Sequence, residues 1–192
     1  SYKKVLKNHP TYEMVFNAKI SKANIFALKE GSTKSIKREL VQMSKDMKNA
    51  EYLDQIFYSL ALITYKDHDT TATLEYLEKS IENSTSNVMQ KAQAYLKRGD
   101  VFFEKQNYVT AEMNYDSALA ALPEDYPGYM KIKDKKKTLS ELVLNLNTIH
   151  VEDSLQALSK MTDKEREKAI DKMIAYLEKE EQRKLEEQKV KE

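Results

Sequence analysis

The residues of this 192-residue chain that could do acid, base or metal chemistry are its histidines and carboxylates. His9, His68 and His150 lie far apart in the sequence, and none belongs to an HExxH or paired Cys/His pattern. The 31 Asp and Glu residues are interleaved with 32 Lys and Arg residues, which is typical of solvated helix faces rather than of paired catalytic acids. We therefore predict that the chain is not an enzyme and that it holds no metal and no cofactor.

The composition excludes several other kinds of site. The chain has no cysteine, which removes disulfides, thiol catalysis and thiolate metal ligands. It has no glycine-rich phosphate loop, and its net charge of +1 gives no field that would attract nucleic acid. No apolar run is long enough to span a membrane. Binding of another protein is the chemistry that remains.

The elements that must position such a binding surface are helices. With only 3 Gly and 3 Pro, the chain has few residues that break helices, and helix-forming residues dominate it. We therefore predict an all-α fold. The clearest pattern lies in 92–125, where two groups of residues with helical spacing are separated by 105–107. The first group is Tyr95, Gly99 and Phe102; the second is Ala111, Tyr115 and Ala118, with Asn107 as the predicted helix cap and Pro123 as the stop.

This spacing, Tyr-x2-Arg-Gly-x2-Phe followed by Ala-x3-Tyr and Pro, resembles the tetratricopeptide repeat (TPR), a helix pair of about 34 residues. The resemblance implies a TPR-type α–α superhelix of antiparallel helix pairs. Gly99 and Ala111 would lie where the two helices cross, with large rings filling the space around them. Arg98 replaces the usual leucine, which predicts that this position is partly exposed. One pair cannot bury its apolar face alone, so neighbouring pairs must stack on it.

A second copy of the pattern occupies 54–87. Phe57 and Thr73 have the same separation as the corresponding residues of the first pattern, although the step between the two copies is four residues longer than the ideal period. The polar turn between the helices predicts Asp69 or Thr70 as the cap of the second helix.

The N-terminal part follows the pattern only in outline. Residues 1–10 have the spacing of the second helix of a truncated repeat, so we expect more repeats upstream of this chain. Residues 13–50 are predicted to form a repeat, with helices over 11–29 and 33–48. The side chains expected to face inward are Val15, Phe16, Ile20, Ala23, Ala27 and Leu28 in the first helix, and Ile36, Leu40, Val41, Met43 and Met47 in the second.

Residues beyond the repeats complete two predicted regions, 1–150 and 151–192. A capping helix over 126–150 would cover the open end of the repeat array. A short helix over 152–161 would then precede a charged terminal helix, which a Thr162–Glu165 capping box begins. The predicted apolar side of the capping helix is Tyr129, Ile132, Leu139, Leu142, Val143, Leu146 and Ile149, and that of the terminal helix is Ile170, Met173, Ile174 and Leu177.

The TPR resemblance also implies a binding site. In that family the first helix of each pair lines a concave groove that holds a protein or peptide segment. Tyr58, Tyr65 and Phe103 would be its aromatic anchors; the alternative is that these rings only pack against the capping helix. The residues carried over to the groove are Gln55, Tyr58, Leu62, Tyr65 and Lys66 in one pair, and Gln93, Leu96, Asp100, Phe103 and Glu104 in the next.

The stretches 52–58, 91–100 and 152–155 are also similar to the TPR lipoproteins of gliding motility and type IX secretion (the PorW or SprE kind). That resemblance implies a periplasmic, outer-membrane-associated scaffold, held by a lipid on a cysteine upstream of Ser1. Two alternatives stay open. One is a helical regulatory or interaction domain of a larger enzyme or signalling protein, and the other is self-association through the charged last helix.

Overall fold

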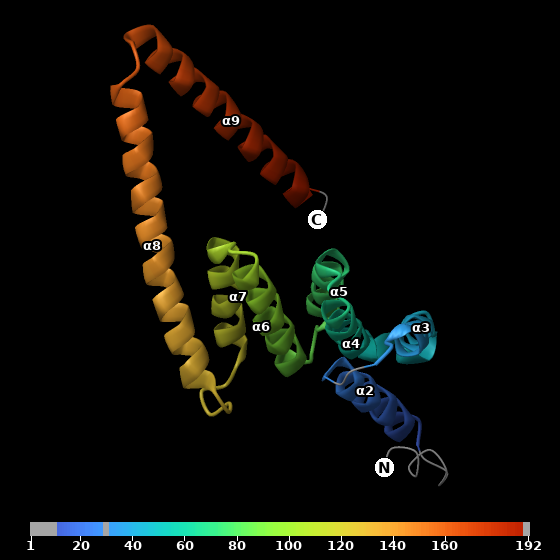
Figure 1. The fold of residues 1–192 in the computed structure, drawn as a ribbon. Coiled ribbons are helices and arrows are strands. Elements are labelled where there is room, and N and C mark those ends of the chain that lie inside the picture. Colours follow the sequence, from blue (N-terminus) through green and yellow to red (C-terminus); the bar gives the residue numbers. More distant parts are fainter. Residues whose placement is uncertain (1–10, 29–30, 190–192) are drawn as a thin grey trace. The chain divides into compact units, whose positions relative to one another are not determined.

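The computed structural model describes residues 11–28 and 31–189, and every regular element within them is a helix (Figure 1). The predicted all-α class is therefore confirmed for these residues. The truncated repeat predicted at 1–10, together with His9, lies outside them. The elements are α2 (Tyr12–Leu28), α3 (Lys34–Met43), the 3-10 helix η1 (Met47–Tyr52), α4 (Leu53–Lys66), α5 (Thr70–Asn83), α6 (Val88–Glu104), α7 (Tyr108–Ala121), α8 (Tyr129–Ser159) and α9 (Asp163–Lys189).

The turns of the two pairs α4–α5 and α6–α7 repeat one local design. Each contains a residue with positive φ, which is His68 at 60° in the first turn and Gln106 at 59° in the second. The next residue then caps the following helix. The side chains of Asp69 and Asn107 each accept a hydrogen bond from the backbone N–H three residues on, at 3.0 and 3.2 Å. The prediction of Asn107 as a cap is confirmed, and Asp69 rather than Thr70 is the cap of α5.

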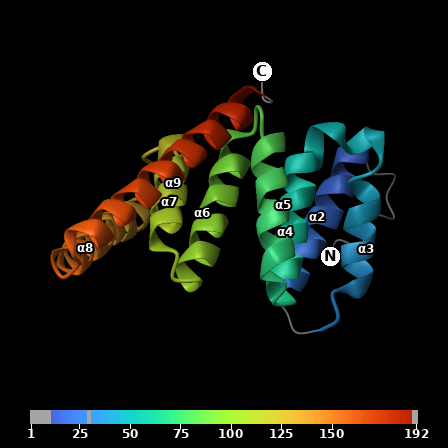
Figure 2. The ribbon, with the colours of Figure 1, turned by 90° about the horizontal axis from the view of Figure 1, so that it is seen from above.

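Small residues lie at the helix crossing, as predicted. α4 packs on α5, α6 packs on α7, and α6 also packs on α4 and α5 (Figure 2). Gly99 and Ala111 are buried between α6 and α7. A Cβ atom at Gly99 would lie 3.0 Å from the ring of Tyr115, so the glycine makes room for that ring. Thr73 and Leu77 are buried at the corresponding places in α5.

Three apolar clusters form the core of the described helices. The first joins α2, α3 and α4, the second joins α4, α5 and α6, and the third joins α6, α7 and the first turns of α8. Their buried members are Phe16, Ile20, Ala23, Ile36, Leu40, Met43, Ile56, Leu60 and Ile63 in the first, Ala61, Leu77, Ile81, Ala94 and Val101 in the second, and Ala111, Tyr115 and Leu139 in the third.

The two N-terminal helices depart from a regular repeat. α2 and α3 each pack against α4, and they contact one another less closely than the helices of the later pairs do. The prediction of one helix over 33–48 is wrong, because α3 ends at Met43 and Asp46 caps the separate helix η1. The inward placement of Met47 and Leu28 is also wrong. Both lie at helix ends, where no neighbouring helix reaches them, and they are 85% and 88% exposed. The other side chains predicted to face inward are buried or half-buried.

α8 is one continuous helix that takes part in both compact units of the chain, 1–143 and 144–192. The predicted break between a helix ending at 150 and another over 152–161 is wrong, because this stretch contains no Gly or Pro that would interrupt a helix. Within the first unit, Leu139 and Val143 are buried. The exposed members of the predicted apolar side are Leu142, Leu146 and Ile149.

The second unit contains the end of α8 and the charged helix α9. Glu165 accepts hydrogen bonds from the backbone amide of Thr162 (2.9 Å) and from its hydroxyl (2.7 Å). The carboxylate half of the predicted capping box is therefore confirmed, whereas the Thr162 hydroxyl, predicted to accept, donates instead. The predicted apolar side chains of α9, which are Ile170, Met173, Ile174 and Leu177, are exposed.

Candidate functional site

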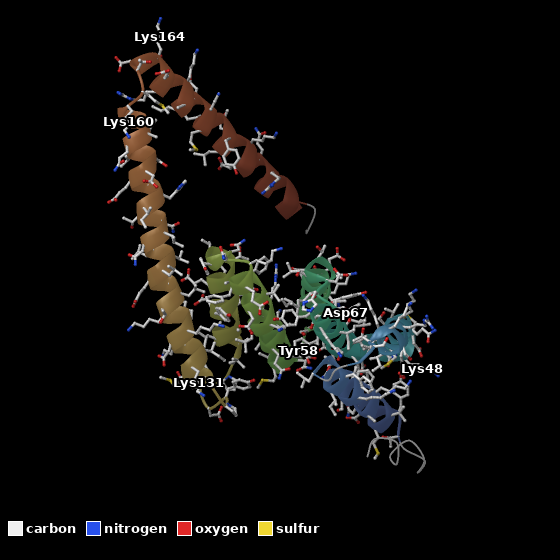
Figure 3. The ribbon with its side chains drawn as sticks, viewed as in Figure 1. Lys48, Tyr58, Asp67, Lys131, Lys160 and Lys164 are labelled. Atoms are coloured by element: carbon white, nitrogen blue, oxygen red, sulfur yellow. The ribbon has the colours of Figure 1, made fainter. Side chains whose placement is uncertain are left out.

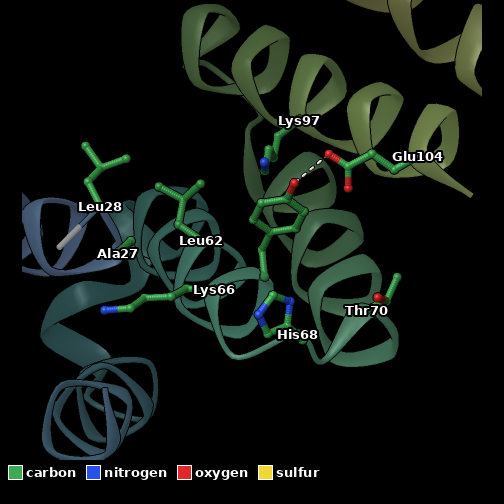
Figure 4. Close-up of a pocket in the computed structure, with 9 residues that line it drawn as sticks. Ala27, Leu28, Leu62, Lys66, His68, Thr70, Lys97 and Glu104 are labelled. Atoms are coloured by element: carbon green, nitrogen blue, oxygen red, sulfur yellow. Dashed lines mark hydrogen bonds between the residues drawn. The ribbon is translucent and has the colours of Figure 1, made fainter. Parts of the chain in front are cut away.

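A hollow of about 570 Å³ opens in the first unit among α2, α4 and α6 (Figure 4). Four residues predicted to face the groove line it, namely Leu62, Tyr65, Lys66 and Glu104. Its other walls come from the end of α2, from the turn before α5 and from the middle of α6. The remaining lining residues are Ala27, Leu28, His68, Thr70 and Lys97.

Tyr65 is held from two sides by residues of α6. Its hydroxyl donates a hydrogen bond to Oε1 of Glu104 at 2.5 Å, and Nζ of Lys97 lies 3.3 Å from the centroid of its ring (Figure 4). The bond to Glu104 raises the pKa of Tyr65 to about 12, and partial burial and the charges of Glu104 and Asp100 add to this effect. Burial lowers the pKa of Lys97, against the opposing effect of the two carboxylates. The phenol therefore stays protonated at neutral pH and keeps its bond to Glu104.

Lys66 fixes the opposite wall of the hollow. Its ammonium donates to the backbone oxygen of Phe26 at 2.8 Å and to that of Gly31 at 3.2 Å. The neighbouring Asp67 accepts a hydrogen bond from the hydroxyl of Thr33 at 2.7 Å. These bonds tie the C-terminal end of α4 to the segment around the end of α2. The hollow is thus bounded by polar contacts on both sides and has an apolar floor.

Phe103 occupies the position in α6 that Tyr65 occupies in α4, 38 residues earlier. Nζ of Lys135 lies 5.1 Å from its ring centroid, and the same ammonium donates to Asp100 at 2.8 Å. Lys135 follows Lys97 by the same 38 residues. In both pairs, then, a lysine from the next first-position helix lies over the groove ring. The start of α8 stands to α6 as α6 stands to α4.

The other residues predicted to face the groove do not line the hollow. Tyr58 lies between α4 and α6, where it packs against the second cluster (Figure 3). Burial raises its pKa, and the charges of Tyr126 and Asp100 add to the shift. Leu96 packs against the third cluster. Gln55 and Gln93 are half-buried outside the hollow. Tyr58, which was predicted as an anchor, therefore serves the packing between helices.

Three lining residues were missing from the sequence prediction. Lys97 follows Gln93 by four residues and precedes Asp100 by three, so helical spacing alone would have placed it on the same face. Leu28 and His68 had no comparable signal. They belong to the end of one helix and to a turn, and only the packing of α2 beside α4 brings them to the hollow.

The arrangement is suited to holding a side chain rather than to transforming one. Ala27, Leu62 and the ring of Tyr65 offer apolar surface, while Lys66 and Glu104 offer charge at its margins. Among the described residues, no group of three or more His, Asp or Glu side chains is placed to hold a metal ion. Apolar surface bordered by a few placed polar groups is typical of sites that bind by shape and orientation.

Comparison with known proteins gives no relative from which a role could be inferred. No protein-family model matches the chain, and no curated protein is similar to it. In the described part of the chain, no helix combines the length and the apolar character needed to cross a membrane.

Proposed function

We propose that this protein is a non-enzymatic scaffold that binds a segment of a partner protein in the hollow among α2, α4 and α6. The observation that carries the proposal is the hollow itself, which Leu62, Tyr65, Lys66 and Glu104 line together. A groove along the first helices of TPR-type pairs would present residues at these positions. The helices that line it are ordered by their own caps and clusters, so the binding surface is preformed.

The TPR-type assignment is part of the same proposal. It is supported by the 38-residue correspondence of turns, of groove rings and of the lysines over those rings. We further propose, from the resemblance of 52–58, 91–100 and 152–155 to gliding-motility and type IX secretion lipoproteins, that the partner belongs to a bacterial cell-envelope assembly. A lipid anchor upstream of Ser1 would be the route to the membrane.

The test uses the chain as bait in native envelope extract, followed by calorimetric titration with the purified protein that is captured. Replacing Leu62→Ala and Tyr65→Ala together removes the floor of the hollow. We expect this variant to bind at least ~10-fold more weakly, because buried aromatic and aliphatic anchors carry most of the energy of such interfaces. Tyr176→Ala is the matched control, since Tyr176 is 60% exposed on α9, outside the hollow.

Each result decides the proposal. Unchanged affinity of the double variant would remove the hollow as the binding site. An equal loss in Tyr176→Ala would move the site to the second unit. Circular dichroism must show that the double variant keeps its helical content and melting temperature, since Leu62 and Tyr65 are half-buried.

A further inference from the structure

The part of α8 beyond Val143 carries an apolar face that is open to solvent. Leu144, Val151 and Leu155 are each more than half exposed. Their separations of seven and four residues place them on one side of the helix, and Leu158 extends the row toward the turn. Leu146 and Ile149 lie on the opposite side. A row of this length on a helix is large enough to need a partner.

α9 carries a second row of the same kind. Ile170, Met173, Ile174 and Leu177 have separations of three, four and seven residues, and each is about half exposed. After Leu177 the sequence becomes almost wholly charged and polar. The apolar row of α9 therefore occupies only the half of the helix that is nearer to the turn.

The two rows have matching positions relative to the turn. Leu144 lies 17 residues before Met161 and Leu177 lies 16 after it, while Val151 lies 10 before and Ile170 lies 9 after. Two helices that fold back on each other at 160–162 would therefore place both pairs of residues opposite one another in one register. Helices joined by so short a connection commonly form an antiparallel hairpin.

The charge pattern of α8 changes where its exposed row begins. In 144–159 the charged residues other than His150 are only Glu152 and Asp153, whereas 129–143 contains five lysines in addition to Asp134 and Glu141. A helix face that stays in water has no need to lose its charges, and depletion of charge is typical of a surface that contacts protein. This observation is independent of the register.

The turn is built to hold the two helices close. Nε of Arg166 donates to the backbone oxygen of Leu158 at 3.2 Å, and its Nη2 donates to that of Met161 at 3.2 Å. The first turn of α9 is thereby attached to the last turn of α8. Thr162 and Glu165 cap the start of α9.

From these features we infer that the apolar row of α8 is the docking surface for α9, so that the two helices close into an antiparallel hairpin with the rows face to face. The occupant is the segment 170–177 of the same chain. In the closed hairpin, Thr148 lies opposite Met173, between the two apolar pairs. The hairpin does not depend on the proposed groove or on its partner.

The natural absence of cysteine makes disulfide trapping a clean test. Pairs of cysteines are introduced in the full chain, mildly oxidised, and followed by non-reducing electrophoresis and mass spectrometry. Because a disulfide needs Cα atoms within about 7 Å, pairs in the inferred register should form an intrachain bond at least ~10-fold faster than a control pair. The test pairs are Leu144→Cys with Leu177→Cys, Val151→Cys with Ile170→Cys, and Thr148→Cys with Met173→Cys; the control is Leu146→Cys with Leu177→Cys.

The outcomes are distinct. Fast intrachain bonds in the register pairs, with a slow control, support the hairpin. Disulfide-linked dimers would overturn it in favour of a second copy as the occupant, and equal rates in test and control pairs would also overturn it. The pair Thr148 and Met173 keeps four aliphatic side chains of the rows intact, so failure at this pair cannot be attributed to loss of apolar surface.

Discussion

The ring of Tyr115 in α7 lies directly over Gly99 in α6, so close that a Cβ atom at Gly99 would stand 3.0 Å from Cε1 of the ring. The other end of the ring is fixed as well, because the Tyr115 hydroxyl donates to Asp100 at 2.6 Å. Burial, with the bond to Asp100, raises the pKa of Tyr115 well above its ordinary range. The ring is held at both ends and has little freedom to move away from an added methyl group.

Gly99→Ala should therefore destabilise the fold, although alanine is the better helix former. The gain in helix propensity is about 1 kcal/mol, and overpacking against a fixed ring costs roughly 1–3 kcal/mol. We expect a net loss of about 1 kcal/mol in the free energy of unfolding, measured by urea denaturation. In a Tyr115→Ala background the same change should become stabilising, since the clash is gone. A rise in stability in the natural background would contradict the packing of Tyr115 on Gly99.

Tyr65 should titrate well above an ordinary tyrosine. Its bond to Glu104 stabilises the protonated phenol, so the pKa of about 12 should appear in the Cζ resonance of isotope-labelled tyrosine, assigned with Tyr65→Phe. Since the folded value lies above the unfolded value of 10.0, the bond contributes to stability below pH 10, and that contribution is lost as the pH rises through 12. Glu104→Ala should return the resonance toward an ordinary titration; an unchanged titration would show that the bond is absent in solution.

Leu40 and Leu28 should respond very differently to the same substitution. Leu40 is 1% exposed in the first cluster, so Leu40→Ala should cost about 2–5 kcal/mol. Leu28 projects at the edge of the hollow, so Leu28→Ala should change the free energy of unfolding by less than about 0.5 kcal/mol. Thermal and urea unfolding compare the two. Similar losses in both variants would place Leu28 in the core, as its sequence spacing had predicted.

Asn107 should contribute to stability through the start of α7. Asn107→Ala removes the side-chain acceptor for the Thr110 amide, and we expect a loss of about 1 kcal/mol in the free energy of unfolding. Asn107→Asp preserves the acceptor and should stay close to the natural stability. Asn145→Ala is the control for an exposed asparagine inside a helix. If Asn107→Ala behaves like this control, the cap is not formed.

The sequence by itself determined the helices, their caps and the crossing of α6 with α7. These features depend on local chemistry, namely on the period of the apolar residues, on a side-chain acceptor at Asp69 or Asn107, and on the need for a glycine where a ring approaches. They could be predicted because the residues that decide them lie within one or two turns of each other. The same reasoning failed at residues 150–152, where a local dip in apolar character was mistaken for a helix end.

Only the tertiary structure decided which side chains form the hollow. Tyr58 and Tyr65 lie on the same helix at groove spacing, yet Tyr58 packs between α4 and α6 while Tyr65 lines the hollow. The difference comes from where α2 and α6 meet α4, and the spacing within α4 carries no information on its neighbours. Leu28 shows the same limit, since its helical period predicts burial but α2 ends before another helix can cover it. Periodicity gives the face of a helix, and the approach of the next helix decides how much of that face remains open.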